Sequence, residues 1–322
     1  MNEACLTCNS KPLRTIRPYR TRFPEGRAIF GGSTLNECDS CGLVQVVPRP
    51  SQEVLDDYYR SDFRRHGYGG SDVADLRRFP RDNLFYYNRG HSTADLIARH
   101  LAAGSDFEVA DVGAGYGHIL QAMGERLSCS QRVAIETSAE CVTFLEAGGL
   151  EVHAAPAEQV LDAMANRFDV VTMTHVLEHL LDPRAVLGQI RASLNDAGLL
   201  CVEVPNIPYE TLLRHPDHAW APRCDEPHIT FFSRNTLTDL LERCGFEVLF
   251  ADTAGPKYRL ISALRFRLPK PKETLVRMLP RSFFDFLRGL SATAAVRVAE
   301  REECFFDYGG FRIWLRCIAR KR

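Results

Sequence analysis

Three glycines spaced two apart interrupt an apolar stretch of the chain where a helical pattern begins. The segment 107–118 reads FEVADVGAGYGH, and in it Gly113, Gly115 and Gly117 follow the apolar alternation around Asp111. Glycine has no Cβ atom, so a ligand can approach the backbone closely at such a turn. A glycine turn between a strand and a helix places that ligand at the helix N-terminus. The pattern predicts a nucleotide-like ligand, although G-x-G-x-G is not the G-x-G-x-x-G of dinucleotide folds.

An acidic residue follows the glycine turn at the distance expected of a ribose-binding carboxylate. Glu136 ends the next apolar stretch, residues 132–135, about twenty residues after the glycines. A carboxylate at that point can accept hydrogen bonds from both hydroxyls of a ribose. Together the two features predict a ligand that contains adenosine, without specifying which one.

Four cysteines form two pairs with the spacing of a metal site. Cys5 and Cys8 make the first C-x2-C pair, and Cys38 and Cys41 make the second. Four thiolates suit a structural zinc ion with tetrahedral geometry. The gap between the pairs is longer than in most zinc ribbons, but loop closure costs little more as a loop lengthens. We therefore predict a structural Zn²⁺ site, with four unrelated buried thiols as the alternative.

Length and composition are those of a globular protein in water. The 322 residues are 45% hydrophobic and 25% charged, enough for one main domain and a small appendage. The net charge of −1 gives no general attraction to nucleic acid or anionic membranes, although basic residues outnumber acidic ones in 251–322. No apolar run has membrane-spanning length, and no signal-peptide pattern is present. We predict a cytoplasmic protein, either a monomer or a homodimer.

Strands and helices are predicted to alternate from the glycine turn onwards. The near-continuous apolar stretches 168–173 and 199–204 are separated by a helical pattern at 183–194. Such alternation predicts an α/β fold with a parallel sheet covered by helices on both faces. The predicted parts are a zinc ribbon at 1–48, a helical lead-in or lid at 49–104, and an α/β domain at 105–322 with a basic helical insertion at about 256–302.

Four sequence blocks, in order and spacing, resemble the class I S-adenosylmethionine-dependent methyltransferases. They read DVGAGYGH, AIETS, FDVVTMTHVLEHLLDP and LNDAGLLCVEVPN. The resemblance covers roughly residues 107–248 and implies a Rossmann-like seven-stranded sheet in the order 3-2-1-4-5-7-6, with an antiparallel last hairpin. Residues 246–251 and 311–318 are the candidates for that hairpin. The implied cofactor is S-adenosyl-L-methionine.

The same resemblance implies which residues bind this methyl donor. Asp111 and the three glycines would cradle its amino acid part, and Glu136 its ribose. The loop after the third strand would lie beside the adenine, and the end of the fourth strand beside the methionine part. A carboxylate at a helix start explains Glu158 equally well. The implied donor-binding residues are Asp111, Gly113, Gly115, Gly117, Glu136, Thr137, Ala157, Glu158, Thr174 and His175.

A narrower resemblance joins the zinc ribbon to this domain. With CDSCGLVQ at its second cysteine pair, the chain is similar to the sugar C-methyltransferases that act on nucleotide-linked deoxy-keto sugars. That family uses one His of an EH segment and one His of a Y-H-E-H motif for acid/base chemistry. The corresponding residues here are His179 and His228, and the imidazole group suits this chemistry because its ordinary pKa lies near neutral pH. A structural role explains His179 equally well, because EH is common among methyltransferases.

This chain departs from that family in two respects. Asp225, Glu226 and Pro227 precede His228, so the tyrosine of Y-H-E-H is missing, and the family's further carboxy-terminal α/β domain is not expected. Methylation of a carbon beside a ketone is therefore doubtful. O-methylation of a hydroxyl on a nucleotide-linked sugar or glycan end, in sugar or polysaccharide biosynthesis, needs only one base. We predict His228 as that base, supported by Asp225 or Glu226.

Two segments are candidates to contact the acceptor. The tyrosine-rich lead-in precedes the glycine turn, and the segment 214–222, RHPDHAWAP, is rich in ring-bearing side chains that suit a sugar. Simple packing is the alternative for each tyrosine. The predicted acceptor contacts are Tyr58, Tyr59, His215, His218 and Trp220.

Other functions fit parts of the sequence. The ribbon could be the reader of an RNA methyltransferase, but the overall charge does not favour nucleic acid, and the N-P-P-Y motif of amino methylation is replaced by VEVPN. A non-catalytic donor-binding scaffold is a further alternative, which the intact glycine turn disfavours. The insertion carries aromatic residues flanked by Arg, which suit contact with a membrane surface, although a packing or dimer helix is simpler.

Overall fold

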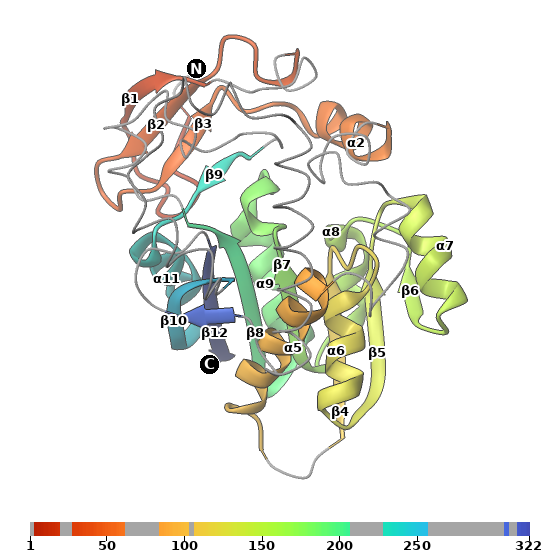
Figure 1. The fold of residues 1–322 in the computed structure, drawn as a ribbon. Helices are drawn as coiled ribbons and strands as arrows, with labels where there is room; N and C mark the ends of the chain where they lie inside the picture. The colour runs from red at the N-terminus through yellow and green to blue at the C-terminus, as the bar shows by residue number, and fades with distance from the viewer. Residues whose placement is uncertain are drawn as a thin grey trace, which may run out of the picture.

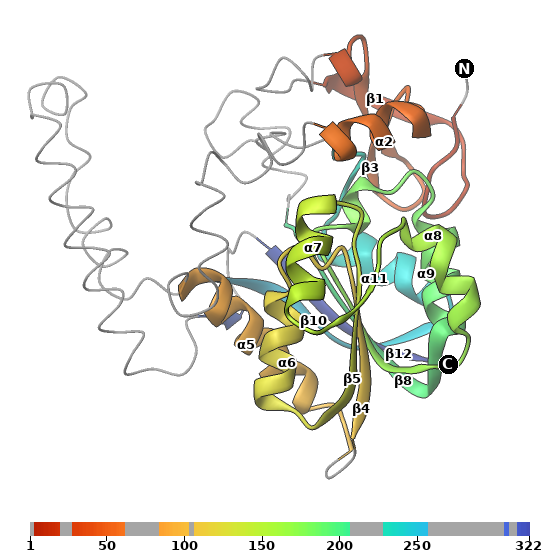
Figure 2. The ribbon, with the colours of Figure 1, turned by 90° about the vertical axis from the view of Figure 1, so that its right-hand side faces the viewer.

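The computed structural model describes residues 3–19, 28–61, 84–102, 106–206, 228–256, 306–308 and 314–322. These residues form an eight-stranded sheet covered by helices and a separate four-stranded sheet near the N-terminus (Figure 1). The small sheet and helix α2 (Gln52–Ser61) lie over the carboxyl ends of the parallel strands (Figure 2). The predicted insertion at 256–302 lies outside the described residues beyond Pro256. No helix among the described residues is long and apolar enough to cross a bilayer.

The large sheet has the predicted order of strands. Its strands run in the order β11-β10-β12-β8-β7-β4-β5-β6, which reproduces the expected 3-2-1-4-5-7-6 order and adds β11 at one edge. Five central strands are parallel, while β12 is antiparallel to both neighbours, as predicted for the last hairpin. The bounds are β4 (Phe107–Val112), β5 (Cys129–Ile135), β6 (Glu151–His153), β7 (Phe168–Thr174), β8 (Leu194–Pro205), β10 (Phe246–Pro256), β11 (Phe306–Tyr308) and β12 (Trp314–Lys321).

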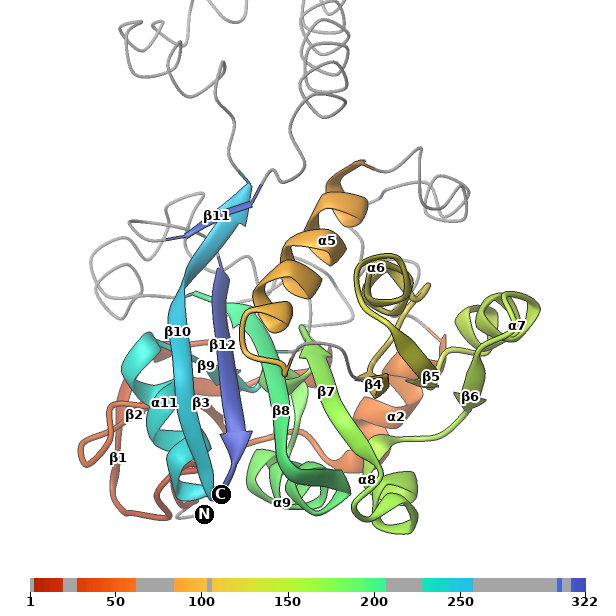
Figure 3. The same cartoon turned by 90° about the horizontal axis from the view of Figure 1, so that it is seen from below.

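Helices cover both faces of this sheet (Figure 3). One face carries α5 (Leu84–Ala98), α6 (His118–Arg126) and α7 (Ala139–Ala147). The other carries α8 (Ala157–Val160), α9 (Pro183–Ser193) and α11 (Arg234–Arg243). A 3₁₀ turn, η1 (Leu161–Met164), continues the short helix α8.

The central strands are apolar because both of their faces are buried. Successive side chains of a strand point to opposite faces. In β7, Val170 belongs to the same hydrophobic cluster as Leu96 and Leu120 of the α5–α6 face, whereas Val171 belongs to the cluster that contains Leu187 of the α9–α11 face. A strand buried in this way has no polar face, which explains the uninterrupted apolar stretches of the sequence.

The small sheet takes one of its strands from the second half of the chain. Its order is β1-β2-β3-β9, with β1 (Leu13–Pro18), β2 (Thr34–Cys38), β3 (Val44–Val47) and β9 (Thr230–Phe231). In the antiparallel β3–β9 pair, Val44 lies opposite Phe231 and Gln45 opposite Thr230. His228 itself lies outside any strand, just before β9, and the edge of β3 supplies the backbone partners of the two residues of β9.

Candidate active site

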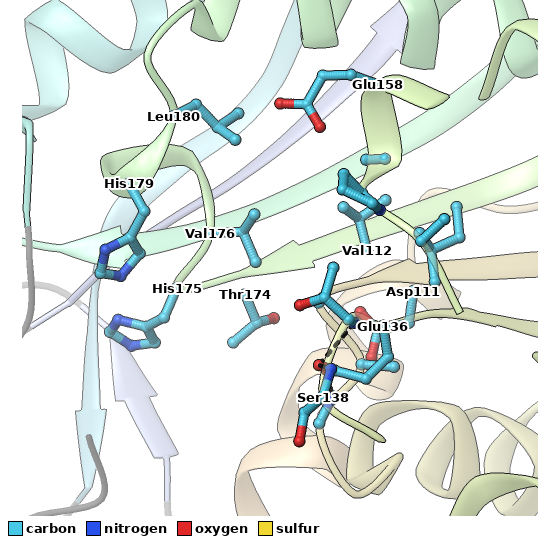
Figure 4. Close-up of a pocket in the computed structure, with 18 of the residues that line it drawn as sticks. Asp111, Val112, Glu136, Ser138, Glu158, Thr174, His175, Val176, His179 and Leu180 are labelled. Carbon is cyan, nitrogen blue, oxygen red and sulfur yellow. Dashed lines mark hydrogen bonds between the residues drawn. The ribbon is translucent and has the colours of Figure 1, made fainter. Parts of the chain in front are cut away.

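A cavity of about 680 Å³ opens where β4, β5 and β7 end. Its volume lies within the range of about 300–1,000 Å³ that is usual for small-molecule sites. Side chains from the ends of these strands face one another across it (Figure 4). The structure brings most of the predicted donor and acid/base residues to its wall, namely Asp111, Gly113, Gly115, Glu136, Thr137, Ala157, Glu158, Thr174, His175 and His179.

We call the side of the cavity formed by Gly113, Gly115 and Glu136 the glycine wall. Gly113 has φ of +70°, and a Cβ atom there would lie 2.4 Å from Val176 Cγ2. Only glycine meets both conditions without strain. Gly117, the N-cap of α6, does not line the cavity; a Cβ atom on it would lie 2.7 Å from Leu145 Cδ2, so its role is close packing.

Glu136 holds the glycine wall together. Its Oε2 accepts a hydrogen bond from Gly115 N at 2.7 Å, and its Oε1 accepts from Thr137 N at 2.9 Å and Ser138 N at 2.8 Å (Figure 4). Three backbone donors fix the carboxylate at the rim of the cavity. This bracing of the glycine turn was not foreseen when Glu136 was predicted as a ribose ligand. A carboxylate has about four acceptor positions, so the bracing is compatible with a further ligand contact.

Asp111 is buried beneath the glycine turn. Its Oδ1 accepts a hydrogen bond from Thr172 Oγ1 at 2.6 Å, and its side chain is only 2% exposed. Burial raises the pKa of Asp111 to about 7; the nearby Glu136 charge adds to this effect, while the hydrogen bond from Thr172 and the Arg89 charge oppose it. Asp111 therefore titrates near neutral pH rather than remaining a permanent anion.

We call the opposite side, formed by His175, His179 and Trp314, the histidine wall. The two imidazoles lie next to each other and face Glu136 across the cavity, with Thr174 between (Figure 4). Trp314 closes this side, with its ring centroid 5.8 Å from that of His175. The positions of the rings follow from the turn after β7, where His175 has φ of +55° and the 3₁₀ helix η2 (Leu177–His179) begins.

A buried carboxylate connects the histidines. Glu178 Oε1 lies 3.0 Å from His175 Nδ1 and 3.9 Å from His179 Nε2. His228 lies behind His179, with 4.8 Å between their ring centroids. Burial acts to raise the pKa of Glu178, but the hydrogen bond from His175 and the charges of the three histidines hold it below its usual value. The anion beside two imidazoles is suited to stabilising a proton on either ring.

Contacts with the small sheet hold His228 in place. Its backbone carbonyl accepts a hydrogen bond from Tyr19 Oη at 3.1 Å. The next residue, Ile229, donates from N to Glu178 O at 2.8 Å and accepts at O from Val46 N at 2.9 Å. The predicted base is therefore fixed between the N-terminal sheet and the turn that carries His179.

Behind the histidine wall lies a buried ion-pair network that sequence reasoning missed. Glu203 Oε1 accepts from Arg89 Nε, and its Oε2 accepts from Arg316 Nε, each at 2.7 Å. Burial opposes ionisation, but the charges of Arg316 and Arg89 lower the pKa of Glu203 to about 2. Arg89 also lies 4.7 Å from the Trp314 ring and lines the cavity. These residues come from α5, β8 and β12, so no local motif could have revealed them.

Not every predicted residue lies at the cavity. Tyr58 and the predicted base His228 are both buried and do not line it, whereas Gln52, Leu55 and Asp56 of the helix that carries Tyr58 do. The described residues also add His118, whose pKa burial lowers to about 3. Outside the described part of the chain lie the side chain of Tyr59 and the whole of His215, His218, Trp220, Asp225 and Glu226.

The four predicted metal-binding cysteines form one cluster. The Sγ atoms of Cys5 and Cys41 are 3.5 Å apart, as are those of Cys8 and Cys38, and all four lie within 4.8 Å of one another. In a tetrahedral zinc site with Zn–S bonds of about 2.3 Å, the sulfurs would be about 3.8 Å apart. The cluster therefore fits a zinc ion with little rearrangement, and the cysteines come from the segment before β1 and from the end of β2 and the turn after it.

Comparison with known proteins agrees with this geometry. Residues 85–250 match the methyltransferase domain family, and the match includes the glycine turn, Glu136, His175 and His179. The chain belongs to this family. It is an S-adenosylmethionine-dependent methyltransferase, and the scaffold alternative is set aside. No curated protein matches the sequence.

Solved structures share the fold of this methyltransferase at low sequence identity. A chain from the complex of the Haloferax volcanii Trm112 methyltransferase activator with a methyltransferase is 16% identical, with a TM-score of 0.51 over 81% of this chain and 96% of that one. A SAM-dependent methyltransferase from Archaeoglobus fulgidus is 18% identical, with a TM-score of 0.47 over 77% and 98%. Burkholderia thailandensis 1,6-didemethyltoxoflavin-N1-methyltransferase is 15% identical, with a TM-score of 0.49 over 90% and 96%.

The residues of the glycine wall fit the methyl donor. A ligand can pass close to the backbone at Gly113, and a rigidly held carboxylate stands at the end of β5. S-adenosylmethionine supplies an electrophilic methyl group on a sulfonium when it is bound. The task left to the protein is to hold an acceptor atom in line with that group and to remove its proton.

Proposed function

We propose that this methyltransferase transfers a methyl group to a sugar hydroxyl, on a nucleotide-linked sugar or at a glycan end. In the transfer, the acceptor oxygen would form a bond to the methyl carbon as the carbon–sulfur bond of the donor breaks, and the hydroxyl proton would pass through His179, which lines the cavity, to His228 behind it. The proposal rests on the placement of His179, His228 and Glu178 beside the wall that faces Glu136. A carboxylate next to two imidazoles stabilises the proton that is removed.

The choice of oxygen over carbon has its own support. A hydroxyl needs a single base, whereas a carbon beside a ketone needs groups that also stabilise an enolate. The histidine wall offers the imidazoles of His175 and His179, with the Glu178 carboxylate behind them, and the Y-H-E-H tyrosine is replaced in the sequence. Support of His228 by Asp225 or Glu226 stays a prediction, as do the acceptor contacts at residues 214–222.

We also propose that the four cysteines hold a structural Zn²⁺ ion. Four clustered sulfurs on a small sheet support this assignment, because so small a sheet has little core of its own. The ion would stabilise the strand β3, whose edge pairs with β9 next to His228. The ribbon at 1–48 would then serve the acceptor side of the cavity.

The proposal is tested by supplying the purified enzyme with labelled methyl donor and a set of candidate acceptors. The set includes nucleotide-linked sugars, oligosaccharides with free ends, and a structured RNA. Formation of a methyl ether on a sugar, detected by mass spectrometry, is the expected outcome. Methylation of the RNA, with binding that weakens steeply as salt is added, would instead establish the alternative of a ribbon that reads RNA.

The first prediction concerns the base. We expect His228→Ala to lower the transfer rate about 10²-fold to 10⁴-fold, the usual contribution of a general base. Affinity for the demethylated donor, measured by calorimetry, should stay within a factor of about two to three, because the glycine wall is untouched. His100→Ala, which removes an imidazole at the end of α5, is the matched control. Full transfer by His228→Ala would exclude His228 as the base.

A further inference from the structure

We propose that Glu178, His179 and His228 form a second cation site, for a divalent transition-metal ion, separate from the four-cysteine cluster. Two imidazole nitrogens and one carboxylate oxygen are a ligand set that holds zinc, iron, manganese or cobalt in proteins. Calcium and magnesium prefer oxygen ligands alone and would bind poorly. Ion binding is independent of the proposed function, whereas the effect of the ion on methyl transfer rests on it.

The three side chains are close enough to share one ion. One ligand atom from each lies within 4.8 Å of the others, and His179 Nε2 is 3.9 Å from Glu178 Oε1. Metal–ligand bonds of about 2.0–2.2 Å place ligand atoms roughly 3–4 Å apart. Small rotations of the side chains would close the remaining difference. The backbone hydrogen bond from Ile229 N to Glu178 O, at 2.8 Å, already holds the segment of His228 against the turn that carries Glu178 and His179.

The surroundings of Glu178 favour an ion. Its side chain is 1% exposed, and Oε1 is oriented by His175 Nδ1 at 3.0 Å. Its second oxygen, Oε2, has no hydrogen-bond partner among the residues that the structure describes. A buried carboxylate oxygen without a partner is costly, and a cation would satisfy it. His175 would then act as the outer hydrogen-bonding group that orients a metal-binding carboxylate.

The site has an open side. His179 lines the cavity, whereas Glu178 and His228 are behind it, so an ion held by the three would approach the cavity through His179. Three protein ligands leave at least one coordination position vacant. An ion there would also occupy the ring nitrogen that His228 needs to accept a proton. Methyl transfer and occupancy of the cation site are therefore mutually exclusive.

The experiment uses the full chain with zinc already in the four-cysteine cluster. Co²⁺ is added, and its binding is followed by visible absorption and by metal analysis after dialysis. We expect one additional Co²⁺ per chain, with ligand-field bands and without the thiolate-to-cobalt absorption that the cysteine cluster would give. Methyl transfer to the acceptor identified above should fall in proportion to Co²⁺ occupancy.

Variants separate this site from the ribbon. Changing a residue that only supports a metal ligand typically weakens metal binding by about 10-fold to 100-fold. Glu178→Gln and His179→Gln remove a ligand itself, so each should weaken the additional Co²⁺ binding by more than this. Zinc content and circular dichroism should stay unchanged, which shows that the variants fold. Glu151→Gln is the matched control. Glu151 Oε1 lies 2.9 Å from His153 Nε2 in a partly exposed pair, and this pair is not part of the histidine wall.

Three results would contradict parts of the proposal. Failure of a second Co²⁺ to bind to the folded chain would overturn the cation site and leave the proposed function standing. Thiolate-to-cobalt absorption alone would mean that Co²⁺ had displaced zinc, and it would overturn the site as well. Binding of the second ion with unchanged transfer would uphold the site and exclude His228 as the base.

Discussion

The glycine wall and the histidine wall face each other across one cavity, but they are assembled differently. The glycine wall comes from the ends of two adjacent strands, and its backbone bonds join residues 113–115 to residues 135–138. The histidine wall draws on the turn after β7, η2 and β12, and His228 lies behind it on a segment paired with the N-terminal sheet. A site for a common cofactor can thus be built locally, while the acceptor side depends on contacts between distant segments.

The difference extends to the charges that support each wall. Backbone N–H groups stabilise Glu136, whereas side chains stabilise Glu178 and Glu203, from the same turn for Glu178 and from other elements for Glu203. Backbone donors are fixed by the strand and turn themselves. Side-chain partners can be changed one at a time, so we expect the histidine wall to be more sensitive to single substitutions, and the following experiments test this expectation.

The largest effect is expected behind the histidine wall. Glu203→Gln would leave the buried guanidinium groups of Arg89 and Arg316 without their counter-charge and lower the free energy of unfolding by about 3–5 kcal/mol. Urea unfolding measures the change. Glu247→Gln, which removes an exposed partner of Arg320, should cost less than about 1 kcal/mol. If the two variants lost the same free energy of unfolding, the buried network would contribute no more to stability than an exposed ion pair.

The next effect concerns a proton under the glycine wall. The folded pKa of Asp111 is about 7 and its reference value is 3.8, so between these pH values the folded carboxyl keeps a proton that the unfolded one has lost. The contribution of Asp111 to stability is therefore full near pH 4 and falls as the pH rises to 7. Relative to Asp111→Asn, the wild type should lose roughly 2–4 kcal/mol over this interval. Parallel unfolding curves would contradict the raised pKa.

A smaller effect tests the close approach of the two walls. Gly113→Ala introduces strain at positive φ and a clash with Val176, so it should destabilise the fold by about 1–3 kcal/mol and weaken binding of the demethylated donor. Gly149 has φ of +74° with no atom near its Cβ position, so Gly149→Ala isolates the backbone strain. If both variants bound the donor like the wild type, the glycine turn would have no direct part in donor binding.

The smallest effect tests the connection to the N-terminal sheet. Tyr19→Phe removes the hydroxyl that donates to the His228 carbonyl, at a cost of about 0.5–1.5 kcal/mol in stability. Transfer should slow, because His228 is less firmly positioned, while affinity for the demethylated donor should not change. A loss of donor affinity equal to the loss of rate would show that the two walls are not independent.

Much of the fold could be predicted because it depends on local patterns. Apolar strands with helices between them predicted a parallel sheet, and the resemblance to class I methyltransferases implied the order of its seven strands; both are confirmed. The glycine turn and Glu136 lie at the cavity as expected, and Cys5, Cys8, Cys38 and Cys41 form the expected cluster. Each of these features is set by spacing along the chain. Which of these residues contact the methyl donor, and whether the cysteines bind zinc, remain predictions.

The remaining features depend on long-range contacts. The pairing of β9 with β3 needs no special residues, because backbone groups make it, and it was therefore missed. Glu178 belongs to the same EH pair as His179, and it could have been noticed as the acidic neighbour of a predicted catalytic group. Arg89 gave no such signal, since its partner Glu203 is more than a hundred residues away.

The shared edge between β3 and β9 also limits how this protein can be rebuilt. A chimera that exchanged only residues 1–48 for another ribbon would have to pair its new edge strand with Thr230 and Phe231. The same chimera would need a donor in place of Tyr19 for the His228 carbonyl. The transferable unit is therefore discontinuous in the chain, and a graft intended to alter acceptor choice should carry residues 228–232 together with the ribbon.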